Sequence, residues 1–308
     1  MLLALALLVA GFAVLLKASD YTVRNSIRLS RCTGISEIII GFVVVAIGTS
    51  VPELSIAIVS SAHGAGALSF GNLIGANIAI LTLIFGAMAL LGFTIEKKRL
   101  MEINQAVIFA GIIAVFMLYL SRTDAAFGIF LIILFYAFLK NIVIEERKKE
   151  KKNRRRNRKV ALKAVAYLIG SVALVVVGAE MITRSATEIA NLFNLGNTII
   201  GATLLAIGTT IPEFSVNIMA LRRKDINLAI GDSIGSIVTN ITLVLGVASL
   251  INPITIDASG RLALMTMLVT GGIFLYFATH LKLKKEQCII LILSYIIFLY
   301  LMLSGTAV

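Results

Sequence analysis

Long apolar runs, separated by short polar segments, dominate the chain. A helix needs roughly 20 apolar residues to cross a bilayer, and these runs are of that order. We count ten of them, at about residues 1–16, 34–60, 66–92, 103–120, 125–144, 161–183, 194–221, 226–250, 260–280 and 287–304. The pattern therefore predicts an all-α membrane protein with ten transmembrane helices.

The composition agrees with this prediction. Of the 308 residues, 59% are hydrophobic and 14% are charged, whereas soluble domains are about 45–50% apolar and about 25% charged. The first run could also be a signal peptide. It has no basic residue before Lys17 and no clear cleavage site, so we interpret it as the first span.

Positive charge is distributed unevenly along the chain, whose formal net charge is +12. The segment from Glu145 to Lys159 holds ten Lys or Arg, and cytoplasmic loops carry such cations. Five spans precede it, so both termini are predicted to lie outside. On this assignment 25 of the 28 cations are inside, and Arg122, Arg184 and Arg261 are outside. The positive charge is thus explained by membrane topology. The basic loop could alternatively contact lipid headgroups. No nucleic-acid partner is predicted.

An internal repeat divides the chain into two halves. Residues 37–86 align without a gap to residues 197–246, with 18 of 50 positions identical. We predict a first five-helix repeat at 1–144, a basic cytoplasmic linker at 145–160 and a second repeat at 161–308. Five is an odd number, so the second repeat enters the membrane inverted. Inverted repeats are typical of transporters.

Each repeat carries a Pro-Glu motif inside an apolar run, "GTSVPELS" at 48–55 and "GTTIPEFS" at 208–215. Proline removes a helical hydrogen bond and should free the backbone carbonyls around Ala46 to Gly48. Glu53 and Glu213 add carboxylates, and hydroxyls come from Thr49, Ser50, Thr209 and Thr210. Only oxygen is offered, which suits hard cations. A charge in mid-membrane costs roughly 3 kcal/mol, so two symmetric glutamates indicate an ion site rather than structural carboxyls.

A second arm follows each motif, "GNLIGANIAIL" at 71–81 and "GDSIGSIVTNI" at 231–241. Its small-xxx-small spacing allows close helix packing. Ser236 and Asn240 share a helix face, but their repeat mates are Ala76 and Ile80, and the first copy has Asn77 instead. Asp232 is a third carboxylate candidate, which either caps a broken helix or takes part in ion or proton binding.

These paired motifs resemble those of the cation/calcium antiporter superfamily, which includes the sodium/calcium exchangers. The resemblance implies ten helices in two inverted repeats, with ions bound between helices two, three, seven and eight. It implies that Glu53 and Glu213 bind calcium. It further implies added oxygens from Thr49, Ser50, Thr209, Thr210 and Ser236, and sodium-binding carbonyls at Ala46 and Ala206. The chain departs from the sodium/calcium pattern at Ala76 and Ile80, where Ser and Asn are usual.

The expected function is a cell-membrane antiporter that exchanges Ca²⁺ for Na⁺ by alternating access. The alternative is an exchanger of protons for Ca²⁺ or another divalent cation, which the missing polar groups at Ala76 and Ile80 favour. No nucleophile, metal-ligand cluster or cofactor motif indicates an enzyme. We therefore expect transported cations and the lipid bilayer as partners and no cofactor, and we leave the oligomeric state open.

Overall fold

The chain folds into two compact units, each drawing on both sequence repeats. The first unit comprises Met1–Pro52, Phe135–Ile189 and Ile211–Ser236, and the second comprises Glu53–Leu134, Ala190–Thr210 and Ile237–Val308. This computed structural model describes residues 2–91, 95, 97–149, 158–190, 201–281 and 285–304. Each unit is described by itself below.

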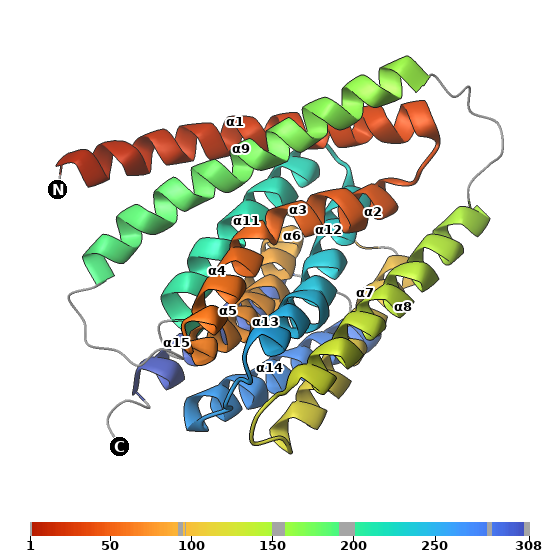
Figure 1. The fold of residues 1–308 in the computed structure, drawn as a ribbon. Coiled ribbons are helices and arrows are strands. Elements are labelled where there is room, and N and C mark those ends of the chain that lie inside the picture. Colours follow the sequence, from red (N-terminus) through yellow and green to blue (C-terminus); the bar gives the residue numbers. More distant parts are fainter. Residues whose placement is uncertain are drawn as a thin grey trace. The chain divides into compact units, whose positions relative to one another are not determined.

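Helices make up nearly all of the described chain (Figure 1). In chain order these are α1 (Leu2–Thr33), α2 (Glu37–Ile40), η1 (Gly41–Ala46), α3 (Ile47–Thr49), α4 (Val51–Ala62), α5 (Gly66–Ala79), η2 (Ile80–Ile84), α6 (Phe85–Leu90), α7 (Lys97–Leu118), α8 (Ala125–Lys149), α9 (Arg158–Ala190), η3 (Gly201–Leu205), α11 (Ala206–Arg222), α12 (Ile226–Thr239), η4 (Asn240–Val244), α13 (Leu245–Ile251), α14 (Ala258–Tyr276), η5 (Phe277–Leu281) and α15 (Lys285–Ser304). The described residues hold no strand, only an isolated antiparallel bridge between Arg122 and Thr255. The predicted all-α class is confirmed.

Seven helices among the described residues are long and apolar enough to cross a membrane, and eight if one bent pair forms a single span. The seven are Gly66–Met88, Lys97–Leu118, Ala125–Glu146, Val160–Gly178, Ile226–Ile251, Ala258–Thr279 and Glu286–Ser304, and the bent pair is Glu37–Thr49 with Val51–Ala62. These eight coincide with eight of the ten predicted spans. Of the predicted run at 194–221, residues 194–200 lie outside the described part.

In the first unit, α1 corrects one prediction. The first predicted span ends at about residue 16, but the helix continues to Thr33. One face of this continuation is buried, with Ala18, Thr22 and Leu29 nearly inaccessible, while the cations face outward. Burial at helical spacing thus maintains the helix beyond the apolar run.

Helices α1 and α9 run side by side in the first unit (red and green in Figure 1). A Cβ added to Gly178 would lie 2.9 Å from the backbone nitrogen of Leu15 and 3.1 Å from the carbonyl oxygen of Gly11. The two backbones therefore approach closely at a glycine, as expected for packed membrane helices.

Glycines also bring α12 against the α2–η1 segment in the first unit. A Cβ on Gly235 would lie 2.5 Å from the Ala46 Cβ and 2.9 Å from the Phe42 Cα, and a Cβ on Gly41 would lie 2.6 Å from the Leu228 carbonyl oxygen. The close packing predicted from the small-xxx-small spacing of the second arm is confirmed here.

The second unit is organised around α5, which packs against η3, η4, α13 and α14. Its side chains are buried on almost every face, including Leu73, Ile74 and Ile78. A Cβ on Gly75 would overlap the Ala202 carbonyl oxygen and lie 2.8 Å from the Ala206 Cβ. Helix α5 therefore lies at the centre of this unit, where its polar side chains are shielded from lipid.

Candidate functional site

Four π-helical segments mark the two motif arms. η1 and η3 begin 160 residues apart, directly before the Pro-Glu motifs, and η2 and η4 also begin 160 residues apart, within or beside the second arms. π-Helical turns in α-helices are rare and are frequent at functional sites. The local backbone therefore repeats with the same offset as the sequence.

The two proline residues act differently on their helices. In the first motif α3 ends at Thr49, Ser50 adopts φ −78° and ψ 8°, and α4 begins at Val51, with a 42° bend. In the second motif Pro212 lies inside α11, which continues from Ala206 to Arg222. The same residue type breaks one copy of the span and is accommodated in the other.

The carbonyls that precede the motifs retain hydrogen-bond donors. The Ala46 carbonyl accepts from the Ser50 backbone N–H at 3.0 Å and from the Thr49 hydroxyl at 3.3 Å. The Ala206 carbonyl accepts from the Thr210 hydroxyl at 2.6 Å. We expected proline to leave the carbonyls around Ala46 to Gly48 without helical donors, but at Ala46 two donors reach the carbonyl.

A buried network in the first unit surrounds Asp232, which is fully inaccessible. The Asn217 side-chain amide donates to Asp232 Oδ2 at 2.5 Å and to the Glu213 backbone carbonyl at 2.8 Å. The Ser233 hydroxyl donates to Asn217 Oδ1 at 3.2 Å, which fixes the orientation of the amide. Within the described residues, Asp232 Oδ1 has no hydrogen-bond partner.

Glu213 lies near this network and is 1% exposed. The Thr49 and Ser236 hydroxyls face its carboxylate, and Asp232 is a neighbouring like charge. Over the part of the chain that the structure describes, neither carboxylate oxygen receives a hydrogen bond of normal geometry, and no ion pair with Lys or Arg is formed. Two adjacent buried carboxylates without a counter-charge are costly, which favours a bound proton or metal cation.

The second unit contains a different polar cluster, composed mainly of amides. The Asn240 side chain donates to Asn77 Oδ1 at 3.2 Å, and Asn77 donates to the Ile237 carbonyl at 3.3 Å. The Thr209 hydroxyl donates to Asn72 Oδ1, also at 3.2 Å. Glu53, in the first turn of α4, is 1% exposed. This unit thus places one buried carboxylate on α4 and gathers amide and hydroxyl groups on α5, α11 and the α12–η4 junction.

The pairing of Asn77 with Asn240 joins positions that are not equivalent in the repeat. The mate of Asn240 is Ile80, and the mate of Asn77 is Ile237. Asn77 of the first repeat nevertheless contacts Asn240 of the second, although the two positions do not align. The first repeat therefore contributes an amide to this cluster from position 77, while position 80 is apolar.

The twelve predicted site residues fall in both units. The first unit holds Ala46, Thr49, Ser50, Glu213, Asp232 and Ser236, and the second holds Glu53, Asn77, Ala206, Thr209, Thr210 and Asn240. All are buried. No group of three or more His, Cys, Asp or Glu side chains that could hold a metal occurs in the described ranges. Among the predicted site residues, each unit by itself therefore offers carboxylate, hydroxyl and carbonyl oxygens, and the second unit adds side-chain amides.

Sequence reasoning missed two members of these networks, Asn217 and Asn72. Asn217 aligns with Ala57 of the first repeat, so a search for residues identical in both repeats did not find it. It lies four residues after Glu213, and a buried amide in an apolar helix was the available signal. Asn72, the repeat mate of Asp232, was not a candidate, although it accepts a hydrogen bond from a predicted site residue, Thr209.

Comparison with known proteins places these features in a family context. The family model described as sodium/calcium exchanger protein matches residues 3–143 and 163–304. The inner membrane protein YrbG of Escherichia coli is 34% identical over 268 residues, covering 83% of this chain and 82% of YrbG. The sodium/calcium exchanger MaX1 of Methanosarcina acetivorans is 27% identical over 337 residues, covering 95% of this chain and 96% of MaX1.

Solved structures of the sodium-calcium exchanger NCX_Mj share the fold. A structure of NCX_Mj soaked with 2.5 mM Na⁺ and 0.1 mM Ca²⁺ matches with a TM-score of 0.79 and 28% identity, covering 96% of this chain and 97% of the exchanger. Another, soaked with 10 mM Na⁺ and no Ca²⁺, matches with a TM-score of 0.81 and 29% identity over the same shares. The similarity thus extends over nearly the full length of both chains.

Proposed function

Because the chain belongs to the sodium/calcium exchanger family, we propose that it exchanges Ca²⁺ for Na⁺ across the cell membrane by alternating access. It is a multi-pass cation transporter of the calcium exchange family, not an enzyme. The observation that carries the proposal is the burial of Glu213 beside the Thr49 and Ser236 hydroxyls, with no cationic side chain paired to it in the described residues. NCX_Mj and MaX1, both named as sodium/calcium exchangers, support the choice of ions.

The proposed architecture is ten transmembrane helices in two inverted repeats, residues 1–144 and 161–308, joined by a basic cytoplasmic linker at 145–160. The matching offset of the π-helical segments supports the repeat. The concentration of cations in the linker supports a cytoplasmic linker and external termini.

In this proposal Glu53 and Glu213 are the charged ligands of the transported cations. Hydroxyl oxygens of Thr49, Ser50, Thr209, Thr210 and Ser236, side-chain oxygens of Asn77 and Asn240, and the carbonyls of Ala46 and Ala206 complete the ligand set. Asp232 is an additional carboxylate whose negative charge would favour cation binding. Oxygen ligands of this kind suit both Na⁺ and Ca²⁺.

Charge balance gives the proposed exchange its coupling. One Ca²⁺ neutralises the carboxylates of Glu53 and Glu213, and so do two Na⁺ or two protons. Burying both carboxylates without a cation would be costly, because neither charge would then be hydrated. An empty transporter would therefore switch slowly between its outward-facing and inward-facing states, while a cation-loaded one would switch readily. Each return step would then require a bound cation, which makes exchange obligatory.

A proton/Ca²⁺ exchanger is the second candidate. The specific observation in its favour is the apolar pair Ala76 and Ile80, both fully buried, where the second repeat has Ser236 and Asn240. Fewer oxygens in the first repeat weaken a Na⁺ site but leave the glutamates able to carry protons. The Asn77–Asn240 contact partly restores the polar character and favours sodium.

Flux in reconstituted vesicles separates the two candidates. The purified chain would be placed in liposomes, and uptake of radioactive Ca²⁺ would be followed with an outward Na⁺ gradient or an outward proton gradient. We expect the Na⁺ gradient to drive uptake and the proton gradient to drive little. Uptake driven only by protons would establish the second candidate, and uptake without any opposing gradient would indicate a channel.

A further inference from the structure

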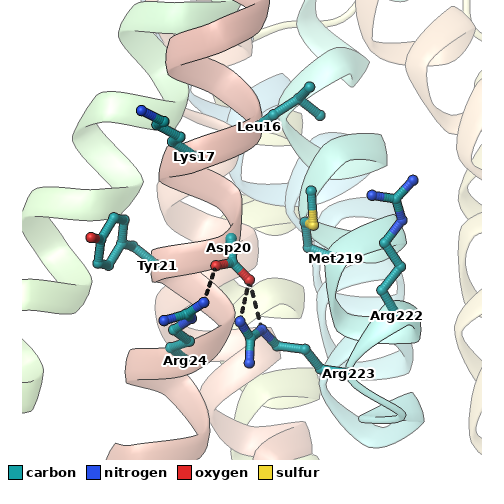
Figure 2. A pocket seen from close by; sticks show the side chains of 8 residues that line it. All are labelled: Leu16, Lys17, Asp20, Tyr21, Arg24, Met219, Arg222 and Arg223. Carbon is teal, nitrogen blue, oxygen red and sulfur yellow. Dashed lines mark hydrogen bonds and ion pairs between the residues drawn. The ribbon is translucent and has the colours of Figure 1, made fainter.

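A groove between α1 and α11 of the first unit is lined mainly by basic and apolar side chains (Figure 2). Its volume is about 720 Å³. The lining residues are Leu16, Lys17, Asp20, Tyr21, Arg24, Met219, Arg222 and Arg223. None of them belongs to the ion ligands proposed above, so the groove calls for a separate explanation.

An ion-pair network joins the two helices along the groove. The Arg223 guanidinium donates from Nε to Asp20 Oδ1 at 2.7 Å, and its Nη2 lies 2.5 Å from the same oxygen. Arg24, one turn further along α1, places Nη2 2.9 Å from Asp20 Oδ2. Figure 2 shows both guanidinium groups converging on the one carboxylate. Asp20 thus holds two cations in fixed positions.

Positive charge exceeds negative charge in this groove. The lining holds four cations and a single carboxylate, because Lys17 and Arg222 add to the two arginines bound to Asp20. Both are exposed, and neither forms an ion pair with another residue in the described ranges. They lie on opposite sides of the groove, Lys17 on α1 and Arg222 on α11. The excess charge would attract an anion to this surface.

Apolar side chains accompany the cations. Leu16 and Tyr21 are 48% and 58% exposed, and Met219 faces the groove from α11. The same part of α1 continues with the exposed cations Arg28 and Arg31. An amphipathic helix with cations on one face is typical of a segment at the membrane interface. By the predicted topology this interface is the cytoplasmic one.

We propose that the groove binds the phosphate-bearing headgroup of an anionic phospholipid of the inner leaflet. Basic pockets between transmembrane helices on the cytoplasmic side recognise such headgroups. The cations would contact the phosphate, and the exposed Leu16 and Tyr21 would contact the acyl chains. A lipid bound there would touch both helices and stabilise the first unit. The proposal does not depend on which cations are exchanged.

The experiment uses the absence of tryptophan from the sequence. A Tyr21→Trp variant carries its only indole at the groove, and an aromatic ring keeps the contact with Arg24, whose guanidinium lies 5.9 Å from the Tyr21 ring centre. The full chain would be reconstituted with brominated phosphatidylglycerol or brominated phosphatidylcholine, which quench nearby tryptophan. Tyr300→Trp, at an exposed position of α15 in the second unit, is the reference reporter.

We expect phosphatidylglycerol to quench the Tyr21→Trp reporter in preference to phosphatidylcholine, and the Tyr300→Trp reporter to show little preference. Adding Lys17→Gln and Arg222→Gln should lower the preference at the groove by about fivefold for each cation removed. The matched pair Arg122→Gln and Arg261→Gln, also exposed, should leave it unchanged.

Three results would overturn the proposal. The groove and reference reporters could show the same lipid preference. The preference could survive loss of Lys17 and Arg222, or fall equally in the matched pair. Inorganic phosphate in the buffer could abolish the preference at millimolar concentration, which would make the groove a site for free phosphate rather than lipid.

Discussion

The polar clusters of the two units differ most clearly at one pair of repeat-related positions, 72 and 232. In the second unit Asn72 accepts a hydrogen bond from the Thr209 hydroxyl. In the first unit the equivalent residue is Asp232, which accepts from the Asn217 amide. Asn217 in turn stands where the first repeat has Ala57. The added carboxylate is therefore accompanied by an added amide donor.

This difference shows how a duplicated framework acquires asymmetry. The backbone features are shared, since the π-helical segments recur with the same offset. The side chains diverge in pairs, because a buried carboxylate left without a donor costs more free energy than a buried neutral amide. Among the predicted site residues, the first unit therefore holds two buried carboxylates, Glu213 and Asp232, and the second holds one, Glu53.

The largest effect is expected at the residues that the two repeats share, Glu53 and Glu213. In the vesicle assay, Glu53→Gln and Glu213→Gln should each lower Ca²⁺ exchange by about 100-fold, because removing one partner of a buried charge interaction costs about 3 kcal/mol or more. Matched carboxylates outside the spans are Asp124 and Asp257, and Asp→Asn there should have little effect on exchange. Exchange at the wild-type rate in either Gln variant would contradict the proposed symmetry of roles.

A second comparison concerns the helix contacts that the repeats have in common, at Gly75 and Gly235. An alanine at Gly235 would meet the Ala46 Cβ at 2.5 Å, and an alanine at Gly75 would overlap the Ala202 carbonyl. Each should destabilise the protein by about 1–3 kcal/mol through overpacking, seen as a lower melting temperature in detergent. Gly170→Ala and Gly272→Ala, with no atom within 4 Å of the added Cβ, are the controls and should be neutral or slightly stabilising. Equal melting temperatures for all four would refute the close packing.

A double-mutant cycle tests whether Asn217 and Asp232 diverged together. Asn217→Ala leaves the Asp232 carboxylate without its amide donor and should lower stability by about 1–3 kcal/mol. The double variant with Asp232→Asn recreates the Ala57 and Asn72 pair of the first repeat and should be less destabilised than the sum of the single changes. Additive losses in thermal unfolding would mean that the two positions are independent.

The smallest effect is expected at Asp225, which directly precedes α12 and has Ala65 as its repeat mate. Asp225 accepts from the Leu228 N–H at 3.1 Å, whereas Ala65 offers α5 no side-chain cap. Burial raises the pKa of Asp225 to about 6; Glu37 adds to the shift, and the Leu228 N–H and Arg31 oppose it. The folded chain therefore holds this proton more tightly than the unfolded chain, whose aspartates titrate near pH 4.

Stability should consequently decrease as the pH rises from about 4 to about 6 and change no further above that range. Asp225→Asn retains the cap and should flatten this part of the pH profile of the melting temperature by a modest amount. An unchanged slope in the variant would show that other groups cause the pH dependence.

The hydrophobic pattern predicted much of the fold because lipid imposes strict requirements on composition and length. Eight of the ten predicted runs coincide with helices able to span a membrane. The helical extension of α1 to Thr33 was missed because its burial comes from packing inside the first unit, which an average hydrophobicity does not reveal.

The candidate site was predictable where the repeats agree and unpredictable where they differ. The Pro-Glu motifs were found because identity between the copies identified them. Asn217 has no polar mate, and Asn77 is out of register with Asn240, so only tertiary packing reveals their contacts. Whether Pro52 or Pro212 breaks its helix also depended on surroundings that the shared motif does not encode.

Calorimetric titration of Ca²⁺ into the purified full chain tests the central claim most directly, because it measures binding without transport. The account predicts one Ca²⁺ per chain, competition by Na⁺, and loss of binding in both Glu53→Gln and Glu213→Gln. Full-affinity Ca²⁺ binding that survives either substitution would contradict it, because the two glutamates could not then be joint ligands of one ion.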